Sequence, residues 1–147
     1  MKNKLFVIVC LLFPLLNSCD GFQISDNGDL DGMWHLVEVD SVQVNHKSDY
    51  TDKGIFWSVQ SDLLFLEDKR QQHQPCLMRF NHKDDILIVT DPYIYMNRES
   101  EDIPLRDVSL LAPYGINGLE DRFVVSKLNK KKMILSSSEL VLNFEKY

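Results

Sequence analysis

From Gly32 to the C-terminus, short apolar segments alternate with polar turns, and this pattern limits the fold more than any other feature of the sequence. We predict nine strands, at 33–39, 41–45, 55–60, 62–66, 76–81, 85–90, 122–128, 132–136 and 139–144. The clusters "NHKDD", "LNKKK" and "SSSE" are typical of the turns between them. Many short strands at this spacing, without a long helical pattern, favour an all-β antiparallel barrel or sandwich.

One segment, between residues 90 and 122, interrupts this spacing and is too long for a structureless loop in a compact domain. Four of its apolar residues fall on one face of a helix: Leu105, Val108, Leu111 and Ala112. Pro113 and Gly115 would end that helix. We therefore predict one short amphipathic helix over 105–112 that caps one end of a barrel, with "DPYIYMNRESEDIP" as its mobile approach.

The first eighteen residues have the pattern of a secretion signal. Lys2 and Lys4 precede an unbroken apolar run over 5–16, which as a helix would span only about 18 Å of a roughly 30 Å hydrocarbon core. A positive start, a short apolar run and small residues indicate a signal peptide and not a membrane span. Residues 20–31 then contain four aspartates and two glycines, which indicates a flexible acidic tether.

The four residues Leu16-Asn17-Ser18-Cys19 resemble the lipobox of bacterial lipoproteins. That resemblance implies cleavage after Ser18 and a diacylglycerol thioether on Cys19, with an ordinary signal peptide and a chance cysteine as the alternative. It divides the chain into a signal peptide (1–18), a lipidated acidic tether (19–31) and a barrel domain (32–147). We expect the lipid to anchor a monomer in the outer membrane, periplasmic or surface-exposed, rather than in the inner membrane.

The net charge of the mature chain excludes one class of partner. Removal of residues 1–18 takes away two lysines and leaves 14 basic and 22 acidic residues, a net charge of −8. An acidic domain repels phosphate backbones, so we expect no nucleic-acid partner.

Cys76 would be the only free thiol, because Cys10 lies in the signal peptide and Cys19 would carry the lipid, and an intramolecular disulfide is then impossible. It is either a buried structural cysteine or an exposed reactive one.

Gly32-Met33-Trp34 resembles the G-x-W signature of lipocalins. With "LDGMWHLVEV", "YGI", "RFVVSKL" and "MILSSSELVLNF", the chain resembles the lipocalin-like lipoproteins of Gram-negative gut bacteria over most of 30–147. The resemblance implies an up-and-down barrel of about eight to nine strands around a ligand cavity, with Trp34 as a structural plug. Lipocalins usually stack an arginine on this tryptophan. Here no arginine follows Arg122, and Lys146 lacks the planar group.

No residue pattern indicates catalysis, a metal or a cofactor. The histidines at 35, 46, 73 and 82 are isolated in sequence, and His73 and Cys76 have no second pair of ligands at a zinc spacing. The acidic pairs lie at predicted turns, where solvation explains them, and nucleophile or phosphate-binding motifs are missing. We therefore predict that the protein binds a ligand or a partner and is not an enzyme. An enzyme of unrecognised type is the alternative, because active sites assemble in space and need no sequence motif.

Alternation from Trp34 predicts which side chains point into the barrel. The residues expected to line a cavity are Leu36, Glu38, Trp57, Met78, Phe80, Val125, Leu135 and Leu142. Ile86 and Ile88 should point inward too. Glu38 would be solvated at the mouth or paired with a polar group of the ligand. Two functions follow: a barrel that binds a small, mainly apolar ligand, or a filled barrel that contacts another envelope protein or a glycan through its outer strands and loops.

Overall fold

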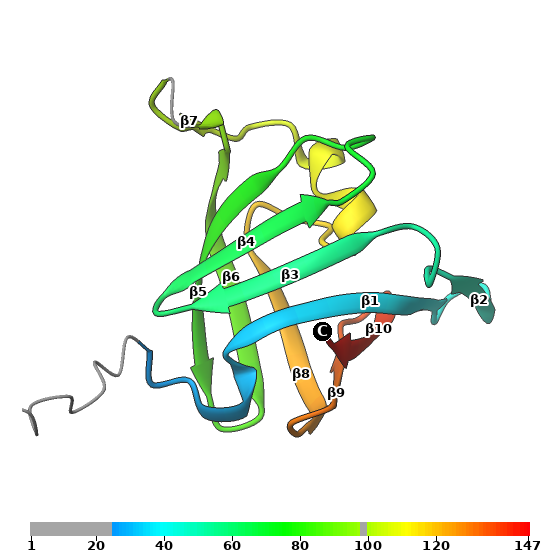
Figure 1. Ribbon diagram of the computed structural model, residues 1–147. Helices are drawn as coiled ribbons and strands as arrows, with labels where there is room; N and C mark the ends of the chain where they lie inside the picture. The colour runs from blue at the N-terminus through cyan, green and yellow to red at the C-terminus, as the bar shows by residue number, and fades with distance from the viewer. Residues whose placement is uncertain (1–24, 98–99) are drawn as a thin grey trace, which may run out of the picture.

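The computed structural model describes residues 25–97 and 100–147, and most of these form a closed barrel of antiparallel strands (Figure 1). The strands are β1 (Gly32–Ser41), β2 (His46–Asp49), β3 (Ile55–Gln60), β4 (Leu63–Asp68), β5 (Cys76–Lys83), β6 (Ile86–Ile94), β7 (Ile103–Pro104), β8 (Asp121–Leu128), β9 (Lys132–Ser136) and β10 (Leu140–Lys146). Eight of them follow the order β1-β3-β4-β5-β6-β8-β9-β10, and β10 pairs back onto β1. This up-and-down barrel confirms the predicted fold class.

The two additional strands extend the barrel wall. β2 pairs with the second half of β1, and β7 pairs with the end of β6. The strand predicted at 41–45 is wrong, because residues 42–45 form the turn between β1 and β2. Asn45 has a left-handed φ of 48°, and Val42 and Val44 expose 54% and 70% of their surface. Their alternation is therefore not the signal of a half-buried strand.

Strand β6 runs further than its predicted end at residue 90, and its inward face is the opposite of the predicted one. Leu87 and Val89 are buried, whereas Ile86 and Ile88 are only half-buried. The register with β5 explains this, because Val89 pairs with Phe80 on the inward side. The side chains of β6 therefore take their direction from the neighbouring strand.

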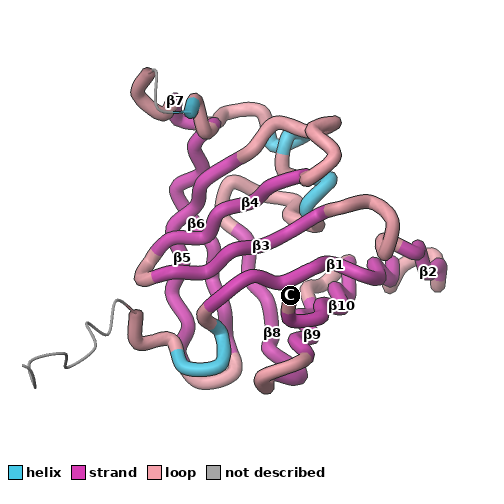
Figure 2. The backbone as a smooth tube through the Cα atoms, viewed as in Figure 1, coloured by secondary structure: helices cyan, strands magenta, loops and turns pink. Residues whose placement is uncertain are grey.

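Short 3-10 turns close the two ends of the barrel, as the helix colour in Figure 2 shows. At the end where β1 begins, η2 (Gly28–Leu30) buries Leu30, so residues 25–31 pack as part of the domain instead of forming the expected tether. Ser25 and Asn27 bind the Asp31 carboxylate and hold this turn. The tether was predicted from the aspartates and glycines of this segment, and that composition gives no sign that Leu30 packs into the core.

The predicted helix over 105–112 is instead two consecutive 3-10 turns, η4 (Val108–Leu110) and η5 (Ala112–Tyr114). Ala112 is exposed and Val108 half-buried, so the predicted face is not the packed one. The apolar side chains that this segment buries are those of Leu105, Leu111, Tyr114 and Ile116. The segment does cap the second end of the barrel, opposite η2 in Figure 1. In the described part of the chain, no helix has the length and apolar character needed to cross a membrane.

Candidate functional site

The barrel interior brings most of the residues predicted to line a cavity into one apolar core. Those that are buried are Leu36, Trp57, Met78, Val125, Leu135 and Leu142. Phe80 is half-buried and packs against this core. At its centre the Trp57 ring lies 5.0 Å from the Phe144 ring and 6.0 Å from the Phe123 ring, between centroids. The predicted residues therefore contact one another.

The interior is filled by these side chains. A cavity wide enough for a ligand would leave accessible surface on the residues that line it. Trp57, Phe123, Phe144 and Leu142 all expose 1% of their surface or less. Barrels of eight strands are narrow enough for side chains to fill them. Among the described residues, the packing therefore corresponds to a filled barrel.

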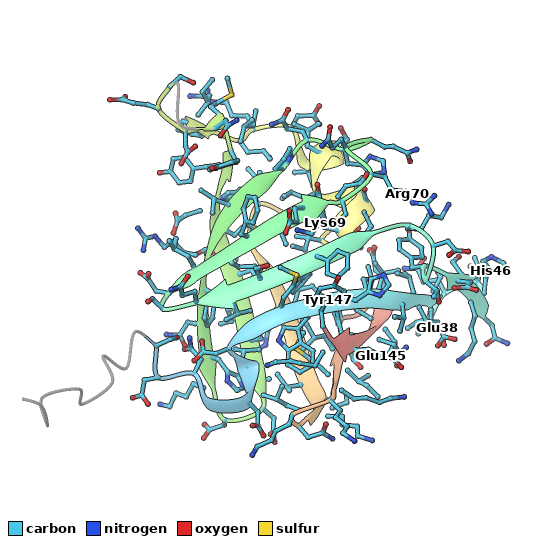
Figure 3. All side chains as sticks on the ribbon, in the orientation of Figure 1. Glu38, His46, Lys69, Arg70, Glu145 and Tyr147 are labelled. Atoms are coloured by element: carbon cyan, nitrogen blue, oxygen red, sulfur yellow. The ribbon has the colours of Figure 1, made fainter. Side chains whose placement is uncertain are left out.

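Glu38 does not belong to the interior, contrary to the prediction. A β-bulge between Leu36 and Glu38 shifts the register with β10, so Val39 is buried in place of Glu38. The Glu38 side chain is 37% exposed and accepts hydrogen bonds from Lys47 Nζ and Asn143 Nδ2, both at 3.2 Å. Figure 3 shows it on the outer surface near the β1–β2 hairpin. Its charge is satisfied by protein groups.

Trp34 closes the end of the barrel where β1 begins. Its side chain is fully buried, and Nε1 donates to Leu30 O at 2.7 Å. Lys146 Nζ lies 4.2 Å from the Trp34 ring centroid and donates to the carbonyls of Asp29, at 2.9 Å, and Asp31. Lysine thus occupies the place where the resemblance implied an arginine.

Gly32 makes room for this lysine. A Cβ atom at Gly32 would lie 3.0 Å from Lys146 Cε, and the backbone φ of 111° is unfavourable for other residues. The glycine and the tryptophan of the G-x-W segment therefore have separate tasks. The glycine admits the Lys146 side chain, and the tryptophan fills the barrel end.

The second end is tied to the core through Tyr114. Trp57 Nε1 donates to Tyr114 O at 3.1 Å, and Tyr114 Oη donates to Gln74 O at 2.9 Å. Gly115 follows in a left-handed conformation, where a Cβ would meet Leu142 Cδ2 at 2.6 Å. The cap therefore packs directly on β10 and on the β4–β5 loop.

Cys76 is a buried thiol of the interior. It exposes no surface, and burial raises its pKa to about 11. A thiol that keeps its proton at neutral pH is a poor nucleophile. Within the described residues, no three His, Cys, Asp or Glu side chains group as metal ligands would.

The outer face of β4, β5 and β6 carries two neighbouring depressions. The first has a volume of about 490 Å³ and includes Leu63, Leu77, Arg79, Asp91, Tyr93 and Asp102 in its lining. The second, of about 780 Å³, includes Phe65, Glu67, Gln74 and Tyr95. Both have volumes within the range of about 300–1,000 Å³ that is common for small-molecule sites. They lie outside the barrel, which is where the geometry leaves room for a ligand.

The sequence prediction missed this face. Asp91 and Tyr93 belong to β6 and Tyr95 follows it directly, whereas the sequence predicts a mobile approach from residue 91 onward. The alternation of Tyr93 and Tyr95 with apolar neighbours is a strand signal. Proline is tolerated at a bulge, which is where Pro92 lies.

Comparison with known proteins agrees with this architecture. A family model described as a lipocalin-like domain matches residues 12–147. A crystal structure of a lipocalin-like protein from Bacteroides uniformis superposes with a TM-score of 0.62 at 15% identity, covering 82% of this chain and 100% of that one. An uncharacterized protein from Bacteroides eggerthii gives 0.53 at 22% identity, covering 80% and 98%. No curated protein matches the sequence.

Proposed function

This chain belongs to the lipocalin-like domain family, and we propose that it is a filled-barrel binding module, not an enzyme, that contacts its partner through its outer surface. The packed interior carries this proposal. Trp57, Phe123 and Phe144 occupy the volume in which a barrel of this size would hold a small apolar ligand. Opening that volume would expose a core whose burial supplies most of the folding free energy.

The outer surface offers what the interior lacks. Large apolar side chains are exposed on it, among them Leu63 at 39% and Tyr93 at 38%. Both line the depression of about 490 Å³. Contiguous apolar surface bordered by polar groups is typical of interaction sites.

We further propose that the module is exported and held at the outer membrane of a Gram-negative envelope by a lipid on Cys19. The support is the lipobox-like segment, which lies outside the residues that the structure describes. Fatty-acid labelling of cells tests the anchor. The label should mark the wild type and be lost in Cys19→Ser, and equal labelling of both would exclude lipidation at this cysteine.

Native mass spectrometry of the protein purified from its own envelope tests the filled barrel. The expected spectrum shows the chain with its anchor and no further small molecule. A stoichiometric apolar compound that leaves only when the protein unfolds would show that the interior opens. The small-ligand function would then replace the proposal.

A further inference from the structure

A β-bulge in β6 shapes the first outer depression. Leu77 pairs with Tyr93 and Arg79 pairs with Thr90, so Asp91 and Pro92 together oppose one residue of β5. Asp91 takes a left-handed φ of 49°, which aspartate tolerates better than most residues. Pro92 is turned inward and buried, while Thr90 and Asp91 both remain on the outer side. Bulges commonly redirect a side chain next to a functional site.

The register of the neighbouring strands places apolar side chains beside Asp91. Leu63 of β4 pairs with Arg79 of β5, and Leu77 pairs with Tyr93 in the next row. Leu63, Leu77 and Tyr93 thus contribute apolar surface to the depression. Outward positions of a barrel strand in water are usually polar. The apolar side chains at these outward positions are therefore unusual, and the barrel does not need them in order to fold.

The charges of the depression are unbalanced. Among the described residues that line it, Arg79 is the only cation, and it already pairs with Asp62. Asp91 accepts from Thr90 Oγ1 at 3.0 Å, and Asp102 accepts from the Met96 amide at 3.1 Å. Among the residues that the structure describes, no lysine or arginine forms an ion pair with either carboxylate. The result is an apolar floor next to two carboxylates that, within the described residues, accept hydrogen bonds but have no ion-pair partner.

We propose that this depression binds a lysine or arginine side chain from a partner protein. The apolar stem of such a side chain would lie on Leu63 and Leu77, its charged head would reach Asp91, and the Tyr93 ring would offer a cation–π contact. The inference rests on the proposed use of the outer surface and specifies its partner. A neutral glycan could stack on Tyr93 and donate its hydroxyls to the carboxylates, but it would leave their negative charge in place, so the charge favours a basic protein segment.

Fluorescence anisotropy of the pentapeptide Ala-Lys-Leu-Lys-Ala-amide, labelled on its N-terminal amine, with the full chain in neutral detergent tests the proposal. Asp91→Asn removes the charge and keeps the left-handed conformation that asparagine also accepts. Asp84→Asn is the matched control, because Asp84 has a φ of 53° and lies in the β5–β6 turn outside the depression. Tyr93→Thr removes the ring and keeps a strand-forming residue.

We expect Asp91→Asn to raise the dissociation constant about two- to fivefold, the range of exposed charge pairs, and Asp84→Asn to leave it unchanged. Tyr93→Thr should weaken binding too, and higher salt should reduce it. Equal effects of Asp91→Asn and Asp84→Asn, equal binding of the peptide with glutamates in place of the lysines, or no binding would overturn the inference.

Maltohexaose as a competitor separates this inference from the proposed function. If the oligosaccharide binds in a Tyr93-dependent way and the lysine peptide does not, the basic partner is excluded while the outer-surface function stands. A small molecule retained in the barrel in the native mass spectrum would instead contradict the proposed function itself.

Discussion

Lys146 lies directly opposite Trp34 in the register of β1 and β10, and its Nζ is 4.2 Å from the centroid of the Trp34 ring. Burial lowers the pKa of this lysine, while Asp29 and Asp31 oppose the shift. The ammonium group therefore gives up part of its hydration. It gains the tryptophan face and the carbonyl oxygens of Asp29 and Asp31, and so joins the η2 turn to the last strand.

Replacement of Lys146 tests this connection. We expect Lys146→Met to lower the free energy of unfolding by about 1–3 kcal/mol, because two backbone carbonyls lose a charged donor. Lys146→Arg should retain most of the stability, since arginine supplies both the charge and the donors. Urea denaturation of the two variants measures the difference. Similar losses for methionine and arginine would indicate that stem packing, and not the charge, holds η2.

Trp34 should be essential for stability as the plug of this barrel end. We expect Trp34→Ala to cost about 3–5 kcal/mol, from lost burial and the cavity left behind. For a domain of this size the melting temperature should fall by on the order of 10 °C or more. Trp34→Phe, which keeps a ring but loses the hydrogen bond to Leu30 O, should cost less. An alanine variant that melts like the wild type would contradict the plug.

Gly115 and Gly28 form a matched pair of left-handed glycines. Alanine at either position costs about 1–2 kcal/mol in backbone strain. At Gly28 a Cβ meets nothing within 4 Å, whereas at Gly115 it meets Leu142 at 2.6 Å. Gly115→Ala should therefore cost a further 1–3 kcal/mol or so in overpacking. Calorimetry of both variants measures this difference, and equal losses would show that the Tyr114 cap can move away from β10.

The buried thiol predicts a specific loss of stability at alkaline pH. The pKa of Cys76 is raised from 9.0 to about 11, so the folded protein keeps a proton that the unfolded chain releases. Stability from this group is complete below pH 9 and is lost as the pH rises to about 11, by about 2–3 kcal/mol. Cys76→Ala should remove that component of the pH dependence.

Thiol labelling gives an independent measure of the same group. Below pH 9, the reaction of Cys76 with a disulfide reagent should follow unfolding, because the folded thiol is buried and protonated. Rapid labelling of the folded chain at pH 8 would mean that the barrel wall opens locally at β5.

The closed barrel could be predicted because its signals are local. Ile55–Gln60 and Lys132–Ser136 match their predicted bounds, since each is a short apolar pattern between polar turns. The 41–45 strand and the 105–112 helix failed for one reason. Their apolar residues follow a regular spacing, but burial depends on which neighbours cover them, and Val44 and Ala112 have none.

The sequence by itself determined the antiparallel barrel architecture and most of its strands, because hydrophobic periodicity and turn residues act over a few positions. The role of the G-x-W segment came from its resemblance to lipocalins. The tertiary structure decided the rest. The bulge at Val37, which the pairing of β1 with β10 sets, turned Glu38 outward. The bulge at Asp91, which the pairing of β6 with β5 sets, placed Asp91 on the outer face. The sequence could not show whether the barrel is hollow or filled. That depends on how Trp57, Phe123 and Phe144 pack against one another, and these residues come from strands that are distant in sequence.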